Sequence, residues 1–451
     1  MELFSQSRGK SCHLRPWSFG WVEPDEPNSE GRLPHARNRT DLQSPRYFES
    51  ISLITFKAAW GFENASTKDD GMNPADFKAP ETGKVIRTPE DYHAFIPAPL
   101  PPRFAYDDDL ALALSRADAA LSELSGLGRL LPNPHLLIGP YIRREAVLSS
   151  RIEGTRASLS DVLLDEMRDD AAHSGAADVH EVRNYVNALE FGVKRLASLP
   201  LSLRLTRELH ARLMKGVRGD RATPGEFRRS QNWIGPAGST PATAAYVPPP
   251  PREMESALAA WEKFLHERDK MPDLVQCALM HEQFEAIHPF LDGNGRVGRL
   301  LITLFLIERG RLSQPLLYLS AYIEDHRQDY YDLLQRTRTH GDWNAWLRFF
   351  LTGVAEMAQD AMRRARELME LREQYRKRLA DKPRALALLD ELFVNPYVTV
   401  ARAEQALKVS NPTARQAVAL LQKHRMLKEV SGRQWGKLYL AQPILDVIEK
   451  S

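Results

Sequence analysis

An almost unbroken helical periodicity over residues 107–376 limits the fold of this chain more than any other feature. Apolar residues recur there at the 3.6-residue spacing that buries one face of a helix. The first predicted helix begins at Asp107 and takes its apolar face from Leu110, Leu112, Leu114, Leu121 and Leu124. Further helices are predicted over residues 143–152, 178–196, 205–214, 254–267, 272–287 and 296–308. The predicted fold class is therefore mainly α.

The rest of the chain differs in composition from this helical region. Residues 1–71 lack a sustained period and are expected to be disordered or not part of the natural protein, which would then begin at Met72. Residues 232–251, rich in Gly, Pro, Ala and Thr, predict a small β-hairpin flap. Residues 356–380 predict a solvated, charged linker helix. Residues 381–451 predict three short helices and a two-stranded wing, the order of a winged helix-turn-helix domain.

Charge and cysteine content exclude several classes of protein. The net charge is +2, so no global electrostatic field favours nucleic acid or an anionic membrane. The two cysteines, Cys12 and Cys277, lie far apart and cannot form a disulfide framework or a cysteine metal site, which favours a reducing cytoplasm. The apolar run at residues 300–307 is too short to span a membrane, and no membrane partner is expected.

One break in the helical pattern, residues 288–299, carries the predicted chemistry. The run reads HPFLDGNGRVGR. Pro289 disfavours helical backbone at His288, so the imidazole is predicted at a helix end, free to point into a cleft. Gly293, Asn294 and Gly295 tolerate the strained backbone of an anion-binding turn. The helix that follows presents its N-terminus, which favours negative charge.

Two guanidinium groups complete a predicted polyphosphate site. Arg296 and Arg299 are three residues apart on the first turn of that helix, and Gly298 between them permits close approach of a ligand. Asp292 would repel phosphates unless a divalent cation lay between them, which predicts Mg²⁺. His288 can take a proton from an incoming hydroxyl group near neutral pH. The glycine-rich turn is not a Walker A loop, and it does not follow a strand, so a Rossmann site is excluded.

The run resembles, without a departure, the Fic family signature His-Pro-Phe-x-Asp-Gly-Asn-Gly-Arg-x-x-Arg. The resemblance implies a Fic helical core that transfers AMP from ATP to a Ser, Thr or Tyr hydroxyl of a target protein and releases pyrophosphate. It implies that His288 is the catalytic base, that Phe290 anchors the loop and that Asp292 holds Mg²⁺. The implied nucleotide-binding residues are Gly293, Asn294, Gly295, Arg296, Val297, Gly298 and Arg299.

Two further implications of the resemblance concern the nucleotide. Tyr330, like Tyr322 and Tyr331, is a candidate contact to adenine or ribose, with core packing as the alternative. Related Doc toxins transfer a phosphoryl group and carry Lys at the position of Gly295, so this glycine favours AMP transfer.

The resemblance also implies a role for the flap, which would hold the target segment as an added strand.

A second motif, from Ser149 to Gly154, resembles the family's inhibitory helix, Ser/Thr-x-x-x-Glu-Gly/Asn. Ser149 and Glu153 are four residues apart and share one helix face. The resemblance implies that Glu153 pairs with Arg299 and blocks the productive pose of the γ-phosphate. It divides the chain into an N-terminal Fic-associated region at 72–170 with an inhibitory helix at about 143–154, a Fic core at 171–355, the linker helix at 356–380 and the winged helix domain at 381–451.

Alternatives to an autoinhibited adenylyltransferase stay open. They are a DNA-binding regulator whose Fic core senses nucleotide, removal of AMP from a modified protein, and another Fic-type phosphotransfer. DNA contacts would come from the recognition helix (Asn411, Thr413, Arg415, Gln416) and from the wing (Arg433, Gln434, Trp435, Lys437). Self-modification and a homodimer are compatible with the sequence, which does not name the target protein.

Overall fold

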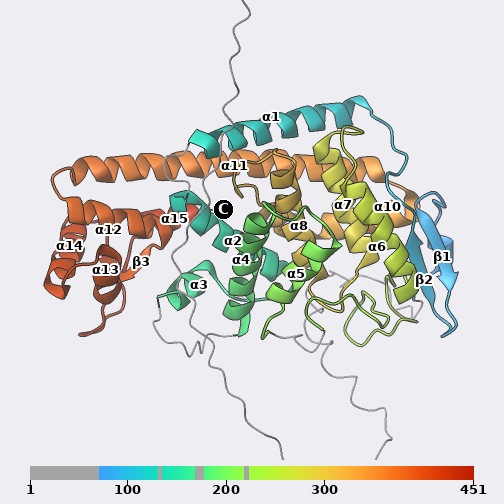
Figure 1. The fold of residues 1–451 in the computed structure, drawn as a ribbon, viewed down its shortest axis with the longest axis horizontal. Coiled ribbons are helices and arrows are strands. Elements are labelled where there is room, and N and C mark those ends of the chain that lie inside the picture. The colour runs from blue at the N-terminus through green and yellow to red at the C-terminus, as the bar shows by residue number, and fades with distance from the viewer. Residues whose placement is uncertain (1–70, 131–134, 168–176, 218–222, 451) are drawn as a thin grey trace, which may run out of the picture. The chain divides into compact units, whose positions relative to one another are not determined.

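The computed structural model describes residues 71–130, 135–167, 177–217 and 223–450, and helices form most of it (Figure 1). The N-terminal segment predicted to be irregular, residues 1–71, lies outside the described residues apart from Gly71. The predicted mainly helical class is confirmed. In the described ranges, no helix is long and apolar enough to cross a membrane.

A β-hairpin that the sequence analysis did not predict comes first in the described chain. After a 3-10 turn, η2 (Pro74–Asp76), strands β1 (Gly83–Arg87) and β2 (His93–Pro97) pair in antiparallel fashion. The backbone N–H of Phe95 in β2 donates a hydrogen bond of 2.9 Å to the carbonyl oxygen of Val247. The hairpin is thereby attached to the end of the segment predicted as the flap.

The flap itself is less regular than the predicted hairpin. Ile234 and Tyr246 form a single antiparallel bridge, with N···O distances of 2.8 and 3.0 Å, in place of two strands. The segment contains several prolines, which have no N–H to donate to a ladder. Tyr246 is fully buried, and its hydroxyl donates to the carbonyl oxygen of Ala286 at 2.7 Å. The base of the flap is therefore fixed to the helix that precedes the motif.

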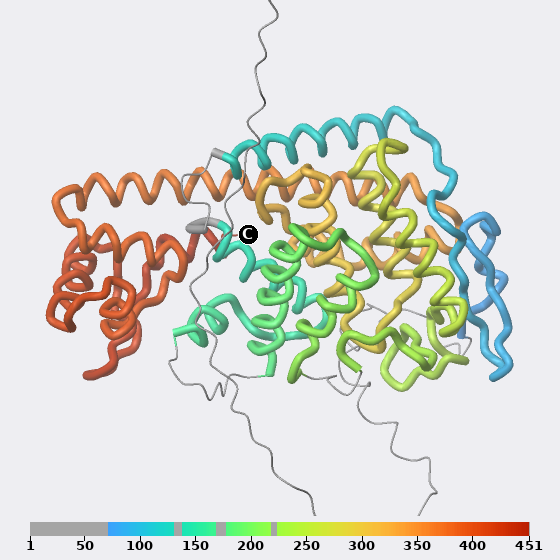
Figure 2. The backbone as a smooth tube through the Cα atoms, in the orientation of Figure 1, coloured from blue at the N-terminus to red at the C-terminus, as the bar shows by residue number. Residues whose placement is uncertain are grey.

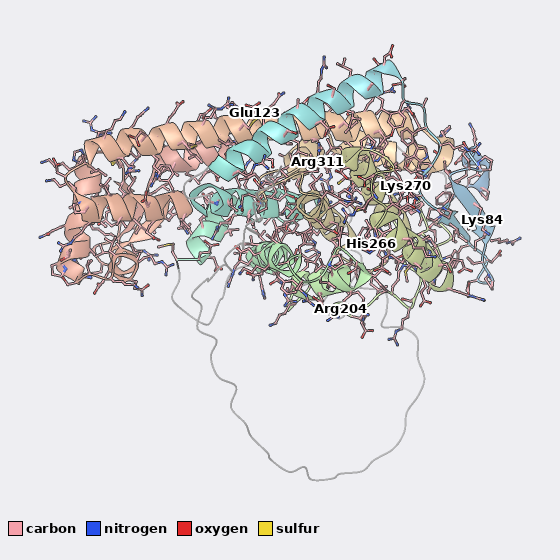
Figure 3. All side chains as sticks on the ribbon, turned by 45° about the horizontal axis from the view of Figure 1, so that its top comes forward. Lys84, Glu123, Arg204, His266, Lys270 and Arg311 are labelled. Atoms are coloured by element: carbon pink, nitrogen blue, oxygen red, sulfur yellow. The ribbon has the colours of Figure 1, made fainter. Side chains whose placement is uncertain are left out.

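The helices around the motif enclose a large apolar core. They are α2 (His135–Ile152), α3 (Leu159–Asp165), α4 (Ala177–Arg195), α5 (Leu203–Leu213), α6 (Pro251–Leu265), α7 (Asp273–Ile287), α8 (Asn294–Glu308), α9 (Ser320–Asp325) and α10 (Arg327–His340). Those that were predicted lie within a few residues of their predicted bounds, except that α2 begins at His135 instead of residue 143. Every residue of α7 after Asp273 is buried, so its polar side chains lie inside the protein. Charged side chains elsewhere, among them Lys84, Glu123 and Lys270, project from the surface (Figure 3).

Two long helices run side by side along this core (Figure 2). α1 (Asp108–Leu130) buries three of its predicted apolar residues, but Leu112 is 50% exposed, so its place on that face was wrong. Residues two positions apart on a helix point in different directions. The predicted linker helix is helical, but only one of its faces is solvated. Its residues continue α11 (Trp343–Arg378) without a break and bury Ala361, Met362, Arg364, Ala365 and Leu368, because α1 and the C-terminal module pack against this helix.

The C-terminal module contains the helices and the hairpin predicted for it. Its elements are α12 (Pro383–Val394), β3 (Tyr397–Thr399), α13 (Val400–Leu407), α14 (Asn411–Lys423), β4 (Lys428–Glu429), β5 (Leu438–Leu440) and α15 (Gln442–Glu449). The strand order is β3-β5-β4, and both pairings are antiparallel. Trp435, between β4 and β5, is 81% exposed. DNA binding by this module, and its assignment as a winged helix, stay predictions.

The C-terminal module also contacts α2, which carries most of the inhibitory motif, and α3, which follows it. α12 and α15 pack against α2. The side-chain amide of Asn395 donates to the carbonyl oxygen of Leu163 at 3.0 Å, and the hydroxyl of Tyr397 lies 3.1 Å from the Oγ atom of Ser160 in α3. The position of α2 relative to the motif is therefore supported from two sides, by the core and by the C-terminal module.

Candidate active site

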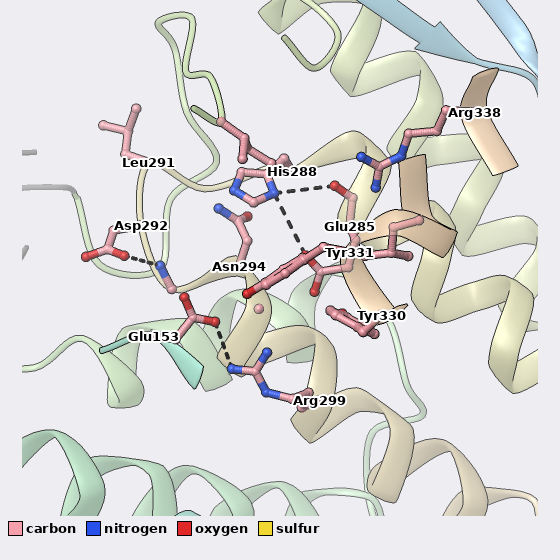
Figure 4. A pocket seen from close by; sticks show the side chains of 14 residues that line it. Glu153, Glu285, His288, Leu291, Asp292, Asn294, Arg299, Tyr330, Tyr331 and Arg338 are labelled. Atoms are coloured by element: carbon pink, nitrogen blue, oxygen red, sulfur yellow. Dashed lines mark hydrogen bonds and ion pairs between the residues drawn. The ribbon is translucent and has the colours of Figure 1, made fainter. Parts of the chain in front are cut away.

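The predicted motif lines a pocket to which the segment after α2, the flap, α7, the α7–α8 loop, α8 and α10 all contribute (Figure 4). Eight predicted residues line it: Glu153, His288, Asp292, Gly293, Asn294, Gly295, Arg299 and Tyr330. Tyr331, also named as a candidate contact, lines it as well, and five further residues were not predicted: Ile234, Glu285, Leu291, Leu334 and Arg338. Residues more than 180 positions apart in the chain thus meet at one site.

His288 ends α7 in the left-handed conformation, with φ 49° and ψ 62°. Pro289 follows it, and the helix stops there as predicted. The buried guanidinium of Arg228 holds this backbone, because its Nε donates to the carbonyl oxygen of His288 at 3.0 Å. Phe290 is fully buried and stacks on the ring of His210, with 3.8 Å between the centroids. The loop is therefore anchored in the core, and the imidazole of His288 faces the pocket.

The turn between the loop and α8 depends on Gly293 and Asn294. Gly293 has φ 77°, and a Cβ there would lie 2.9 Å from the sulfur atom of Met214. The side chain of Asn294 accepts from the N–H of Phe290 and donates to its carbonyl oxygen, both at 2.8 Å. The side-chain amide of Asn294 therefore closes the loop onto Phe290.

Asp292 presents a carboxylate that is 42% exposed. Its Oδ1 accepts from the N–H of Gly293 at 2.6 Å and lies 3.8 Å from a guanidinium nitrogen of Arg296. Across the described residues, no group of three or more His, Cys, Asp or Glu side chains could hold a metal ion. One carboxylate fits Mg²⁺ only if phosphate oxygens and water complete its octahedral shell.

Arg299 is bound by three oxygen atoms from α2 and the residue that follows it. Its Nε donates to the Oγ of Ser149 at 2.8 Å, and its Nη2 donates to the Ser149 carbonyl oxygen at 2.9 Å and to Oε1 of Glu153 at 2.8 Å. Burial alone would raise the pKa of Glu153, but the charges of Arg299 and Arg296 lower it below its ordinary value. The pair is therefore ionised at neutral pH, and Glu153 occupies the arginine end of the pocket.

Three predicted nucleotide-binding residues do not line the pocket. Arg296 is buried and pairs with Glu181, with 3.3 Å between Nη1 and Oε2. Val297 is fully buried in the core. Gly298 lies against Glu285, where a Cβ would be 2.6 Å from Oε1. In a helix, successive residues turn by about 100°, so only part of the motif can face a ligand.

Tyr330 takes part in the core as well as in the pocket wall. It is almost fully buried, and its hydroxyl lies 2.9 Å from Nε2 of His281. Tyr322 packs with tilted rings against His326 and Phe349, and it does not line the pocket. Of the three candidate tyrosines, Tyr330 and Tyr331 line the pocket.

Two charged pocket residues escaped the sequence analysis. Glu285 lies one helical turn before His288, a spacing that could have signalled a shared face. Arg338 comes from α10 and pairs with Glu282 of α7 at 3.2 Å, and nothing near it in the sequence signals this.

Burial lowers the pKa of His288 to about 3, with help from Arg228 and Arg338, so the imidazole is neutral at physiological pH. A neutral imidazole can accept a proton.

Two segments of the chain match models of a known protein family. Residues 200–306 match the family described as Fic/DOC family, and residues 111–194 match the Fic/DOC family N-terminal domain. The chain contains both domains of the Fic/DOC family. The Fic match spans α5 to α8 and contains His288 and the turn at Gly293, while the N-terminal match contains α2 with Ser149 and the following Glu153.

Similar proteins carry the name protein adenylyltransferase Fic. The chain is 32% identical to that of Culex quinquefasciatus over 145 residues, which is 32% of this chain and 25% of the relative. It is 28% identical to that of Drosophila grimshawi over 198 residues, 43% of this chain and 35% of the relative. The chain thus spans a quarter to a third of the length of the curated relatives it matches.

Two solved structures are similar in backbone. One is a Fic family protein from Desulfovibrio desulfuricans G20, with a TM-score of 0.48, 22% identity, and coverage of 76% of this chain and 98% of that one. The other is Fic-1 from C. elegans, with a TM-score of 0.43, 20% identity, and coverage of 56% and 72%.

Proposed function

We propose that this protein is an ATP- and Mg²⁺-dependent protein adenylyltransferase that modifies a Ser, Thr or Tyr hydroxyl of a target protein. One observation carries the proposal: a neutral imidazole, an exposed carboxylate, a glycine turn at a helix N-terminus and a buried arginine line one pocket. The names of the similar proteins support the same activity. The scarcity of cysteines supports a cytoplasmic location.

The side chains suggest how the transfer proceeds. His288 takes the proton of the target hydroxyl while its oxygen attacks the α-phosphorus of ATP. The bond to the β-phosphate breaks, and pyrophosphate leaves. The N-terminus of α8, opened by Gly293 and Gly295, would hold phosphate oxygens, and Asp292 would hold Mg²⁺. When bound, the ion neutralises phosphate charge. Catalysis would rest on positioning and charge stabilisation.

We infer that the enzyme is inactive at rest because Glu153 uses the arginine that the γ-phosphate needs. All three hydrogen bonds of Arg299 go to Ser149 and Glu153. A phosphate that approached this end of the pocket would also meet the Glu153 carboxylate, with a charge of the same sign. Removing that carboxylate frees the guanidinium and the space beside it.

Incubation of the full chain with ATP labelled at the α-phosphate tests both parts of the proposal. The Glu153→Gly variant should label itself or a protein in a cell lysate much more strongly than the wild type. Adding His288→Ala should abolish that label. Glu166→Gly is a matched control, because Glu166 also pairs with an arginine beside a helix end, Arg143 at 2.6 Å, but does not line the pocket. Label from the γ-phosphate without label from the α-phosphate would refute AMP transfer.

Removal of AMP from a modified protein is the second candidate. The observation that favours it is that the Glu153 carboxylate lines the same pocket as His288, where it could orient a water molecule. A target labelled by the Glu153→Gly variant would be mixed with wild-type enzyme. Release of labelled AMP that depends on Glu153 would support this second activity, and a stable label would exclude it.

A further inference from the structure

Glu285 is a buried acid in the pocket wall to which the transfer described above assigns no role. It lies on α7, one turn before His288. Its Oε2 is 4.0 Å from Nδ1 of His288, and its carbonyl oxygen is 3.4 Å from the same nitrogen (Figure 4). Its Oε1 is buried without a hydrogen-bond partner among the described residues. The carboxyl group is thus directed at the imidazole of the proposed base, and one of its oxygens is unused.

The neighbouring helix leaves space for this carboxyl group. A Cβ on Gly298 of α8 would lie 2.6 Å from Oε1 of Glu285 and 3.2 Å from the ring of His281. A glycine inside a helix is less stable than an alanine by about 0.5–1 kcal/mol. Because every larger residue would displace the carboxyl group, Gly298 and Glu285 form a matched pair.

The charges that face Glu285 come from three other segments. Arg299 of α8 and Arg338 of α10 favour the carboxylate, whereas Glu153 and Glu282 oppose it. Tyr330 and Tyr331 of α10 face it as well. Burial raises the pKa of Glu285 to about 7, even though Arg299 acts against this. The group therefore changes its charge near neutral pH.

His288 lies in surroundings that disfavour its protonated form. Burial is the main cause, and the positive charges of Arg228 and Arg338 add to it. The carbonyl oxygen of Glu285 and the more distant Glu153 act in the opposite direction. A base in this position needs a nearby negative charge when it takes up a proton, and the Glu285 side chain is placed to supply it.

We propose that Glu285 is the positioning residue of the catalytic base: its oxygens hold the Nδ1–H of His288, and its carboxylate stabilises the imidazolium. The inference rests on the proposed AMP transfer. The hydroxyl proton moves to Nε2, the new bond forms between oxygen and the α-phosphorus, and the bond to pyrophosphate breaks. Nδ1–H stays in place throughout, and its contact with Oε2 shortens as the positive charge develops. In the Ser-His-Asp triad, the aspartate likewise holds the histidine in one tautomer and stabilises the imidazolium that forms.

The pH dependence of AMP transfer in the Glu153→Gly background tests this role. The parent should show a rise of kcat with pH that is centred below pH 7, because removing Glu153 takes away one of the charges that raise the pKa of Glu285. Glu285→Gln should lose that rise and lower kcat by about tenfold or more, with the KM for ATP within twofold. Glu285→Asp, which keeps the charge, should keep the rise and recover part of kcat. A rise that persists unchanged in Glu285→Gln would overturn the proposal.

Nitrogen NMR of His288 at pH 7.5 supplies a readout that needs no activity. Nδ1 should carry the proton in the parent, and Glu285→Gln should show a mixture of tautomers. Glu145→Gln is the control, since Glu145 is equally buried but does not line the pocket. If the parent transfers no AMP, the proposed function fails while the tautomer still reports on Glu285. An unchanged tautomer in Glu285→Gln would refute the positioning role.

Discussion

Glu153 and Gly295 are in contact at the entrance to the arginine end of the pocket. A Cβ on residue 295 would lie 2.2 Å from Oε1 of Glu153 and 2.9 Å from Nη1 of Arg299. The resting arrangement therefore requires a residue without a side chain at this position. The glycine that opens the N-terminus of α8 to phosphate is also the glycine that admits the inhibitory carboxylate.

Gly295→Ala should strain the protein more when Glu153 is present than when it is absent. In the wild-type background the added methyl meets the carboxylate, and a loss of about 1–3 kcal/mol in the free energy of unfolding is expected. In the Glu153→Gly background only the guanidinium of Arg299, 2.9 Å from the added Cβ, opposes the change, so the loss should be smaller, and alanine favours the helix by about 0.5–1 kcal/mol. Urea denaturation of the four proteins measures the difference. Equal effects in both backgrounds would show that the two residues are not coupled.

Ser149→Ala should activate the enzyme weakly. It removes one of the three acceptors of Arg299, while the Ser149 carbonyl oxygen and Glu153 remain. One hydrogen bond to a charged group contributes about 1.5–3 kcal/mol at most, so the gain in initial rate should stay well below that of Glu153→Gly. Ser150→Ala is the control, because the buried Oγ of Ser150 has no hydrogen-bond partner among the described residues. If Ser149→Ala activated the enzyme as strongly as Glu153→Gly, the predicted ranking of the two variants would be contradicted.

Tyr330→Phe should affect stability more than nucleotide affinity. The lost hydroxyl lies 2.9 Å from Nε2 of His281, which would be left without a partner in the core. A loss of about 1–3 kcal/mol in the free energy of unfolding is expected, with the KM for ATP within about twofold. Thermal unfolding and steady-state kinetics in the Glu153→Gly background check both values. A tenfold rise in KM would assign the Tyr330 hydroxyl to the nucleotide instead.

The buried carboxyl group of Glu145 should make its contribution to the free energy of unfolding depend on pH. Burial raises the pKa of Glu145 and that of Glu285 to about 7, whereas an ordinary Glu ionises near 4.5. Between these values the folded state keeps protons that the unfolded state releases, so the contribution of each carboxyl group to stability falls as the pH rises and levels off above 7. Burial lowers the pKa of His210, His281 and His288, and these histidines act in the opposite direction. Urea denaturation of the wild type and of Glu145→Gln at pH 5, 6, 7 and 8 cancels the histidine contribution, because both proteins share it. The stability of the variant relative to the wild type should increase with pH, and a difference that does not change with pH would contradict the assignment.

Part of this protein could be predicted from local sequence because the physical causes are local. Helical periodicity predicts α4, α5, α6 and α7 within a few residues, since each buries one continuous face or lies wholly in the core. Pro289 ends α7, and Gly293 takes the positive φ that few other residues adopt. Ser149 and Glu153 share a face by their spacing alone. The sequence of the motif alone therefore predicts the imidazole, the carboxylate and the turn.

The contacts between distant segments were decided only by the tertiary structure. The rotation of α8 relative to α4 decides whether Arg296 faces the pocket or Glu181. The residues of the motif do not predict that rotation. α11 buries one face along its length because α1 and the C-terminal module pack against it, although its charged composition is typical of a solvated helix. Nothing in the sequence of α7 distinguishes Glu285 from other glutamates. It becomes a partner of His288 because α8 and α10 enclose it in the fold. Burial turns a common carboxyl group into one that titrates near neutral pH, and burial is a property of the assembled fold.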